Sequence, residues 1–368
     1  MILKFKKNNI KFLLLPLLCT LHFSYCLEVT NSTTSNCQSI LFKGIDLLHQ
    51  GKYLESIDQF AIVTNILPDH PVGYFFYAAA IEWLMIDYRN FERQKEYIKG
   101  IEKAIHISEK RVKTHPKSAW SYFYRGASYG FRGIYYMDFG NIVKGFLDGM
   151  KGYKDMRRAI AIDSQLYDAY YAFGMFHYWR SHYARSMTWL PFVANEKDEG
   201  ISQIQTAVKK GIYVGIEAAS SLIRIYHNEG VYENSRKNHT AAGQNFSNAI
   251  YTAQRILADY PNYLYCYWYL AECYSELTLY DNAADTLQWV LRYFEARPQA
   301  GPIGLLEVKY KIGLIYFKKK DYQSSYHYLH AVAQSTVDIN EQLVKLENYP
   351  RKARELLKNK NFSPYGPR

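Results

Sequence analysis

The sequence predicts an all-α protein, and three observations support this class. Apolar residues recur at three- and four-residue spacing from about residue 38 to about residue 358, which is the period of an amphipathic helix and not the alternation of a strand. Hydrophobic residues make up 48% of the 368-residue chain, enough for a substantial core. Small residues also repeat at a regular spacing, which predicts helices packed as repeated pairs.

The first 26 residues have the pattern of a signal peptide. Residues 1–11 are basic and hold no acidic side chain, and the apolar run Phe12–Phe23 is too short to span a bilayer comfortably. Ser24 and Cys26 occupy the small positions that a leader peptidase needs, so cleavage is expected after Cys26. The sequence therefore predicts secretion across the inner membrane to the periplasm, with a lipid-anchored or an extracellular protein as the alternatives.

The charge and the cysteine content limit which kinds of site the chain can form. The formal net charge falls from +11 to +7 when the four lysines of residues 1–26 are removed, so the mature chain is moderately basic. Its three cysteines, Cys37, Cys266 and Cys273, form no CxxC pair, and no metal site is expected. We expect buried or unpaired thiols, with a disulfide from Cys37 to a distant helix as the alternative in an oxidising compartment.

One segment near the N-terminus has the residue order of a known helical repeat. The order consists of Gly44-x-x-Leu47, Gly51-Lys52-Tyr53, Ser56, Phe60 and Pro68. It resembles the tetratricopeptide repeat, a pair of antiparallel helices of about 34 residues. The same order returns around Tyr280 and around Tyr322, with a small residue three places after the tyrosine. A small residue at this place lets two helix backbones approach closely.

The small position can be followed through the whole chain and gives a register for the repeats. It falls on Ser56, Ala104, Gly152, Gly200, Ala249, Ala283 and Ser325. The separations are 48, 48, 48, 49, 34 and 42 residues, so the middle repeats are longer than those near the C-terminus. An excess of about 14 residues is close to four helical turns. We therefore expect longer helices in repeats two and three.

The register divides the chain into seven expected helical hairpins. They lie at roughly 37–70, 71–117, 118–165, 166–213, 214–262, 263–297 and 304–339. Repeat four places Pro191 between its helices, and repeat five places the polar run Glu233–Gln244 there, which we expect to form a loop. We also expect a flexible segment at 27–36, a capping helix at 340–359 and a disordered tail at 360–368.

The resemblance implies a right-handed superhelical solenoid whose first helices line a concave face that binds an extended or helical peptide. Transferred one repeat at a time, the inward-facing positions are aromatic. They fall on Phe75 and Trp83; Trp120, Phe123 and Phe131; Tyr171, Met175, Tyr178 and Trp179; Tyr226 and His227; and Tyr265, Trp268 and Glu272. Grooves that clamp a peptide carboxylate carry Lys, Arg and Asn at these places, so docking of a carboxylate terminus is disfavoured.

Two other roles for these aromatic residues remain open. Tyr and Trp at helical spacing serve more often as core than as a ligand site, and longer hairpins need extra apolar surface to pack. The superhelix could also fill its own groove, either with the C-terminal helix or by winding tightly. Exposure of the side chains decides between these alternatives, because a large exposed apolar patch marks an interaction site.

The most suggestive polar group lies in repeat four and comprises His177, Arg180, His182 and Arg185. Three of them, without His182, share one side of a helix if the helix continues through them. With the surrounding tyrosines they could hold an anion, a carboxylate or a sugar, although a histidine on an aromatic face is more often structural. No carboxylate lies within the same turn, which disfavours a catalytic or metal role. A bound group is first expected at the connection Arg180–Val193.

Motifs of enzymes do not occur in the sequence in the structural context that they need. It has no Gly-rich phosphate loop after a predicted strand, no His-Glu-x-x-His and no nucleophile elbow between a predicted strand and a helix, so neither catalysis nor a cofactor is expected. Nucleic acid is disfavoured because the basic residues are scattered. The sequence predicts a non-catalytic scaffold in an envelope assembly, peripheral to the envelope, that binds a protein or peptide through the aromatic groove or the hairpin tips. The alternatives are a carrier of an apolar molecule or glycan, and then an enzyme that uses His177 and Arg180.

Overall fold

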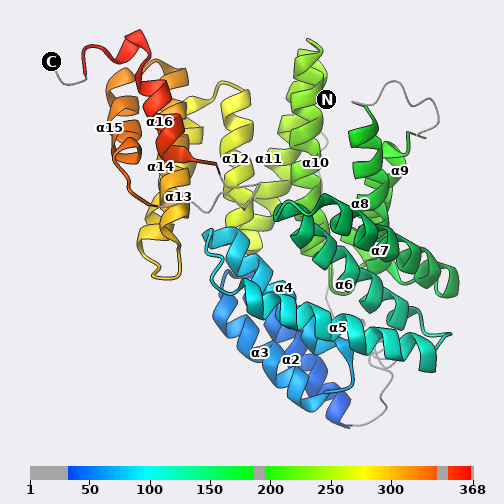
Figure 1. Cartoon of the computed structure of the whole chain (residues 1–368). Coiled ribbons are helices and arrows are strands. Elements are labelled where there is room, and N and C mark those ends of the chain that lie inside the picture. The colour runs from blue at the N-terminus through cyan, green and yellow to red at the C-terminus, as the bar shows by residue number, and fades with distance from the viewer. Residues whose placement is uncertain (1–31, 186–194, 338–346, 366–368) are drawn as a thin grey trace, which may run out of the picture.

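The computed structural model describes residues 32–185, 195–337 and 347–365, and these ranges form helices and no strand (Figure 1). The helices are α2 (Ser32–His49), α3 (Tyr53–Ile66), α4 (Pro71–Tyr88), α5 (Gln94–Thr114), α6 (Ala119–Asp138), α7 (Ile142–Ile162), α8 (Tyr167–Ala184), α9 (Lys197–Lys210), α10 (Gly215–Ser235), α11 (His239–Asp259), α12 (Leu264–Glu276), α13 (Tyr280–Glu295), α14 (Pro302–Lys319), α15 (Tyr322–Ala333) and α16 (Tyr349–Leu357), followed by the 3-10 turn η1 (Lys360–Phe362). The predicted all-α class is confirmed. The predicted leader 1–26 and Pro191 lie outside the described residues. None of the described helices is long and apolar enough to cross a bilayer.

The helices from α2 to α15 pair as seven hairpins, at the places that the small-residue register predicts. Every member of the register is buried. Ser56 Oγ donates a hydrogen bond to the carbonyl oxygen of Gly44 across the first hairpin, at 2.7 Å. In the fourth hairpin, a Cβ atom on Gly174 would lie 2.5 Å from the carbonyl oxygen of Gly200. Small residues therefore allow the close approach of the paired helices, as the sequence predicts.

Repeats two and three use their extra residues to lengthen both helices, and short turns join them. α4 ends at Tyr88, and Arg89 ends the helix in a left-handed conformation with φ 51°. α6 ends at Asp138, and Gly140 takes a positive φ of 78° in the turn before α7. These connections fall where the sequence places them.

Repeat five differs from the expectation, because most of the polar run Glu233–Gln244 is helical. α10 continues to Ser235, and α11 starts at His239. Lys237 makes the reversal with a positive φ of 63°, and the Asn238 side chain caps α11 by accepting a hydrogen bond from its first turn. A polar composition therefore marks an exposed hairpin end here, and not a loop.

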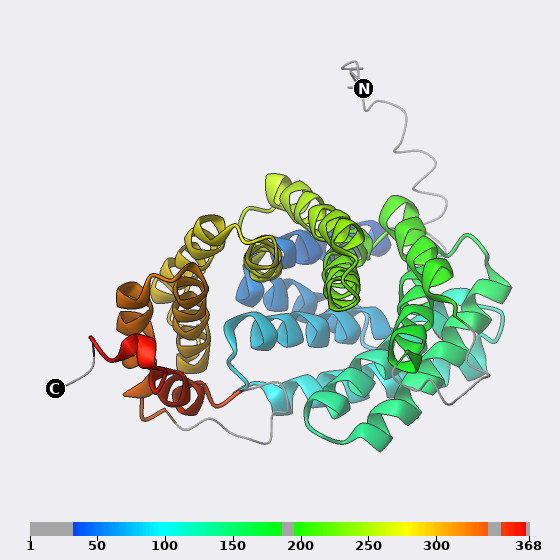
Figure 2. The ribbon, with the colours of Figure 1, turned by 90° about the horizontal axis from the view of Figure 1, so that it is seen from above.

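The superhelix winds tightly enough for repeats one and two to contact repeats five to seven. The C-terminal end of α2 lies close to the N-terminal end of α10, and the C-terminal end of α4 lies close to the N-terminal end of α14 (Figures 1 and 2). His49 Nε2 lies 2.8 Å from Glu217 Oε1 of α10, and Arg89 Nε donates to Glu307 of α14 at 2.7 Å. The structure thus corresponds to the alternative in which tight winding fills much of the groove.

At both ends of the repeat array, helical turns extend into segments where the sequence predicts none. α2 begins at Ser32, within the segment 27–36 that is expected to be flexible. At the other end, α16 packs on α14 and α15, and residues 340–346 of the expected capping helix lie outside the described residues. The tail continues as η1 because Phe362 is buried against the Phe317 ring, at 5.6 Å between ring centres.

Candidate functional site

Five of the aromatic side chains predicted to line the groove are core residues. They are at most 7% exposed and comprise Phe75, Trp120, Phe123, Tyr178 and Trp268. Trp120 lies 5.2 Å from the Phe123 ring, and the Arg89 guanidinium lies 5.4 Å from the Trp268 ring centre. A partner cannot reach these side chains while the superhelix stays closed.

A second group of predicted residues is half-buried and comprises Trp83, Tyr171, Met175, Trp179 and Tyr226. Trp83 of α4 is covered by the rings of Tyr263 and Tyr265, each at 5.8 Å. Tyr226 accepts a hydrogen bond from Gln205 of α9 at 3.3 Å. Only part of the predicted groove is therefore accessible, and a binding role for these residues stays a prediction.

One cation on this aromatic face was missed from the sequence. The guanidinium carbon of Arg224, on α10, lies 4.7 Å from the Trp179 ring centre, and Tyr171 and Ser221 share a hydrogen bond of 2.8 Å beside it. Within the described ranges Arg224 has no carboxylate partner, and its buried Nε has no acceptor. Burial acts to lower the pKa of Arg224, but nearby hydroxyls, Tyr265 first, raise the pKa overall, so the charge is retained.

The polar group of α8 does not form a single site. His177 Nε2 and Arg180 both meet Glu196, the residue before α9, with 3.6 Å between His177 and the carboxylate. His177 Nδ1 lies 3.0 Å from the side-chain oxygen of Gln203. The carboxylate comes from beyond the α8–α9 connection, which is why none is visible within the same turn of the sequence. Both residues are engaged in joining α8 to α9.

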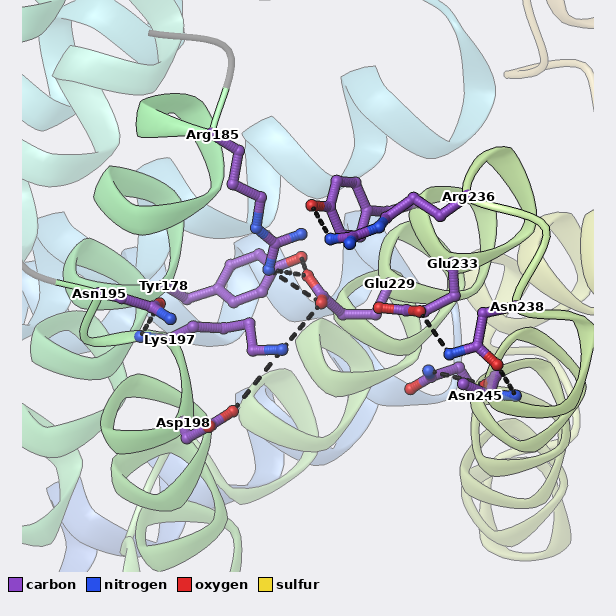
Figure 3. A network of polar contacts seen from close by, with 12 residues as sticks. Tyr178, Arg185, Asn195, Lys197, Asp198, Glu229, Glu233, Arg236, Asn238 and Asn245 are labelled. Atoms are coloured by element: carbon purple, nitrogen blue, oxygen red, sulfur yellow. Dashed lines mark hydrogen bonds and ion pairs between the residues drawn. The ribbon is translucent and has the colours of Figure 1, made fainter. Parts of the chain in front are cut away.

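Arg185 belongs to a different cluster, centred on Glu229 of α10 (Figure 3). Arg185 Nη2 donates to both carboxylate oxygens at 2.9 Å. Lys197 of α9 donates at 3.1 Å and the Tyr178 hydroxyl at 3.0 Å. Glu229 itself is 4% exposed. Side chains of α8, α9 and α10 therefore meet at one buried carboxylate.

The negative charge of Glu229 is fully compensated by the cations and donors around it. Burial acts to raise the pKa of Glu229, but the Arg185 and Lys197 cations outweigh it and the pKa is lowered. Burial and the negative charge of Glu229 raise the pKa of Tyr178, so the phenol remains a donor. Burial and Arg185 lower the pKa of His182. A carboxylate with three donors is poorly suited to act as a general base.

The thiols are equally unsuited to nucleophilic chemistry. Cys37, Cys266 and Cys273 are buried and unpaired. Burial raises the pKa of each thiol, which keeps it protonated and unreactive. No group of His, Cys, Asp or Glu in the described part of the chain has the arrangement of a metal site.

A cleft of about 590 Å³ lies between α2, α10 and α11. Its lining is chiefly apolar and includes Phe42, Ile45, Ile212, Tyr213, Ile216 and Tyr251. Charged residues Asp46, Arg255 and Asp259 also line it. The sequence did not indicate this cleft, because its walls come from different repeats that meet only when the superhelix closes.

Comparison with known proteins assigns no family to the chain. No family model matches the sequence, and no curated protein matches it. A thermophilic TPR protein of Thermus thermophilus has 14% identity and a TM-score of 0.39, with 66% of this chain and 98% of the other covered. A tetratricopeptide repeat protein of Parabacteroides merdae has 12% identity and a TM-score of 0.37, with 88% and 100% covered.

Human IFIT1, solved as a dimer with PPP-AAAA, has 12% identity and a TM-score of 0.44, with 93% of this chain and 81% of the other covered. At such identities and TM-scores these likenesses carry no argument. The architecture rests on the helices described above. They form a helical-repeat solenoid of tetratricopeptide-like hairpins, as the sequence predicts.

Proposed function

We propose that this chain is an exported, non-catalytic scaffold that holds a segment of a partner protein in the cleft between α2, α10 and α11. The segment is apolar and carries a lysine or an arginine. The cleft itself is the observation that supports the proposal. Its volume of about 590 Å³ lies within the range of about 300–1,000 Å³ that is typical of binding sites.

The walls of the cleft supply apolar contact area. Phe42 of α2 and Ile212, just before α10, are 36% and 38% exposed, and Tyr251 of α11 is exposed further. Ile216 and Ala219 lie on α10 between them. Burial of such side chains by a partner is favourable by about 25 cal/mol per Å² of apolar surface.

Charge at the cleft defines the partner. The cleft is lined by two carboxylates, Asp46 and Asp259, and by one cation, Arg255. Glu217, bonded to His49 of the lining, has a buried carboxylate oxygen without a donor. Acidic groups therefore outnumber basic ones here, although the whole chain carries a formal net charge of +11. Complementary charge favours a cationic group on the partner.

Two labelled peptides test the site by fluorescence anisotropy, one built of leucine and lysine and the other with glutamate at every lysine. We expect the lysine peptide to bind. Ala219→Trp, which fills the cleft, and Ile212→Lys, which repels the peptide, should each weaken binding about tenfold or more, a loss of about 1.4 kcal/mol. Asp259→Asn should weaken it several-fold.

The matched control is Ala331→Trp, the same substitution at an exposed position of α15, which should bind as the wild type does. Ile212 is already partly exposed, so its variant is expected to fold, and circular dichroism verifies this. Equal binding of both peptides would refute the charge assignment. Wild-type binding by both cleft variants would refute the site.

Export is supported by the leader pattern of residues 1–26. Cell fractionation with mass spectrometry of the N-terminus tests it. We expect a chain that starts after Cys26 in the periplasmic fraction. Recovery of the uncleaved chain from the cytoplasm would contradict export without affecting the cleft.

A carrier of an apolar small molecule is the second candidate, and the same cleft volume favours it. Native mass spectrometry of the purified chain separates the two. A bound small molecule that is lost in Ala219→Trp supports the carrier. A bare chain that binds the lysine peptide supports the scaffold.

A further inference from the structure

Hairpin α6–α7 exposes an apolar surface that no other described segment covers. It consists of Ile134, Met137, Ile142, Val143, Phe146, Leu147 and Met150. Their exposed fractions run from 40% to 71%. We call these seven residues the hairpin-three surface. Most soluble proteins avoid such a group of exposed apolar side chains, and its presence marks a contact with something else.

The hairpin-three surface is one continuous face. Ile142, Phe146 and Met150 are four residues apart along α7, and Val143 and Leu147 repeat the spacing beside them. Residues at this spacing lie above one another on a helix. α6 adds two further residues next to the turn that joins the helices. The apolar side chains therefore gather at the tip of the hairpin.

The carboxylates of α7 are turned away from this face. Asp148 accepts hydrogen bonds from Arg132 at 2.7 and 3.1 Å, and Asp155 accepts them from Arg125 at 2.7 and 2.6 Å. Both aspartates are buried. Each negative charge of α7 is thus neutralised inside the hairpin by an arginine of α6.

The exposed charges of α7 are all positive. They are Lys144, Lys151, Lys154, Arg157 and Arg158. Lys151 remains 54% exposed although it lies 3.4 Å from Asp148. An apolar stripe flanked by lysine and arginine, without acidic residues, is the composition of a helix that lies in a membrane interface.

We infer that the hairpin-three surface docks onto a bilayer of anionic lipids, with α7 lying among the headgroups. Protein-binding hot spots are enriched in Trp, Tyr and Arg, and leucine and valine are rare in them. The hairpin-three surface is aliphatic apart from one phenylalanine, so a protein partner fits it less well. Basic residues next to a membrane are attracted by anionic headgroups.

This attachment is independent of the cleft. The cleft lies between α2, α10 and α11, and the hairpin-three surface lies on α6 and α7. A chain that lies on a membrane by one hairpin could hold its partner at another place. Ala219→Trp should therefore leave vesicle binding unchanged, and failure of either proposal does not decide the other.

Vesicle flotation tests the inference with phosphatidylethanolamine–phosphatidylglycerol vesicles and with phosphatidylcholine vesicles. The full chain is used in every arm, so any contribution from residues 1–31 is the same throughout. We expect strong binding to the anionic vesicles and weak binding to the neutral ones. The double variant Phe146→Ser/Leu147→Ser should lose at least about tenfold in binding.

Lys144→Gln/Lys151→Gln should lose about fivefold per lysine at low salt and show a weaker dependence on salt. The matched control is Leu54→Ser/Ile62→Ser, which removes two similarly exposed apolar side chains from α3 and should bind as the wild type does. All substituted positions are exposed, so the variants are expected to fold.

Three results would overturn the inference. One is the absence of wild-type binding to anionic vesicles. Another is equal binding by the wild type and Phe146→Ser/Leu147→Ser. The third is equal binding to anionic and neutral vesicles. Self-association or capture of a protein through this surface, without vesicle binding, would assign it to a protein contact instead.

Discussion

Hairpins α6–α7 and α8–α9 share the 48-residue register but place their charges differently. In α6–α7, Arg132 of one helix binds Asp148 of the other. In α8–α9, Tyr178 and Arg185 reach beyond the hairpin to Glu229 of α10. The first hairpin neutralises its own carboxylates, and the second depends on the next repeat.

This difference suggests that the two hairpins have different roles in the array. A hairpin that satisfies its own charges keeps a free outward face, which α6–α7 fills with apolar and basic residues. A hairpin whose cations bind the next repeat adds to the interface between repeats, on which the stability of repeat proteins depends. Five predictions test this comparison, from the largest expected effect to the smallest.

Glu229→Ala should have the largest effect. It leaves Arg185 partly buried without its counter-charge and leaves Lys197 only Asp198, at 3.7 Å; loss of one partner from a buried ion pair costs about 3–5 kcal/mol. Denaturant unfolding measures the loss, and hydrogen exchange should show it spreading over α8, α9 and α10.

Asp148→Ala is the counterpart in the other hairpin. We expect a smaller loss of about 1.5–3 kcal/mol, confined to α6 and α7, because Arg132 keeps its contacts with the Tyr129 and Tyr136 rings at 5.4 and 5.7 Å. An Asp148→Ala loss equal to that of Glu229→Ala, spread over the neighbouring repeats, would remove the distinction.

Gly174→Ala should destabilise by about 1–3 kcal/mol, because overpacking forces the backbone to move. The added Cβ would lie 2.5 Å from the Gly200 carbonyl oxygen. Gly126→Ala is the matched change in α6, where the nearest atom, Asp155 Cβ, lies at 2.9 Å. Thermal unfolding measures both losses. A larger loss of stability from Gly126→Ala than from Gly174→Ala would contradict the prediction that the closer approach, between α8 and α9, tolerates the added methyl group less well.

Acid should weaken the contribution of Glu229. Its pKa in the folded chain lies below the ordinary value of 4.5, so the unfolded chain takes up this proton first. The stabilisation is complete above the ordinary pKa and is lost as the pH falls through the folded-state pKa. The difference in stability between wild type and Glu229→Gln should therefore shrink between about pH 7 and about pH 3. A difference that grows on acidification would reverse the assigned direction of the pKa shift.

Gly149→Ala should have the smallest effect, and it should stabilise. Gly149 lies within α7, and a Cβ there would have no neighbour within 4 Å. Alanine in a helix interior is favoured over glycine by about 0.5–1 kcal/mol. A rise in the midpoint of thermal unfolding is the expected observation, and a fall would show that the outward face of α7 is covered in solution.

The hairpins were predictable because a local pattern determines them. A small residue is needed wherever paired helices cross, so Ser56, Gly152 and their equivalents give the register without knowledge of the fold. The prediction of a loop at the polar run of repeat five was wrong, because composition alone does not distinguish the helical end of a hairpin from a loop. There the cap at Asn238 decided the outcome.

The sites were harder to predict, since they depend on how repeats far apart in the sequence meet. The curvature that brings α4 against α12 accumulates from small angles between successive hairpins, and no residue spacing records it. Glu229 and Tyr178 are 51 residues apart, and only the packing of α8 on α10 brings them together. Glu229 is one of three glutamates in α10, so the sequence did not single it out, and it did not single out Arg224 either.

The contacts that close the superhelix also constrain the order in which the chain can fold. Arg89 and Glu307 are 218 residues apart in the sequence, so α4 is synthesised long before its partner on α14 exists. At about 5–20 residues per second, this gap lasts on the order of tens of seconds. Throughout that time the end of α4 lacks the cover of α14, so closure of the superhelix, a non-local step, is expected only after the last repeats are made.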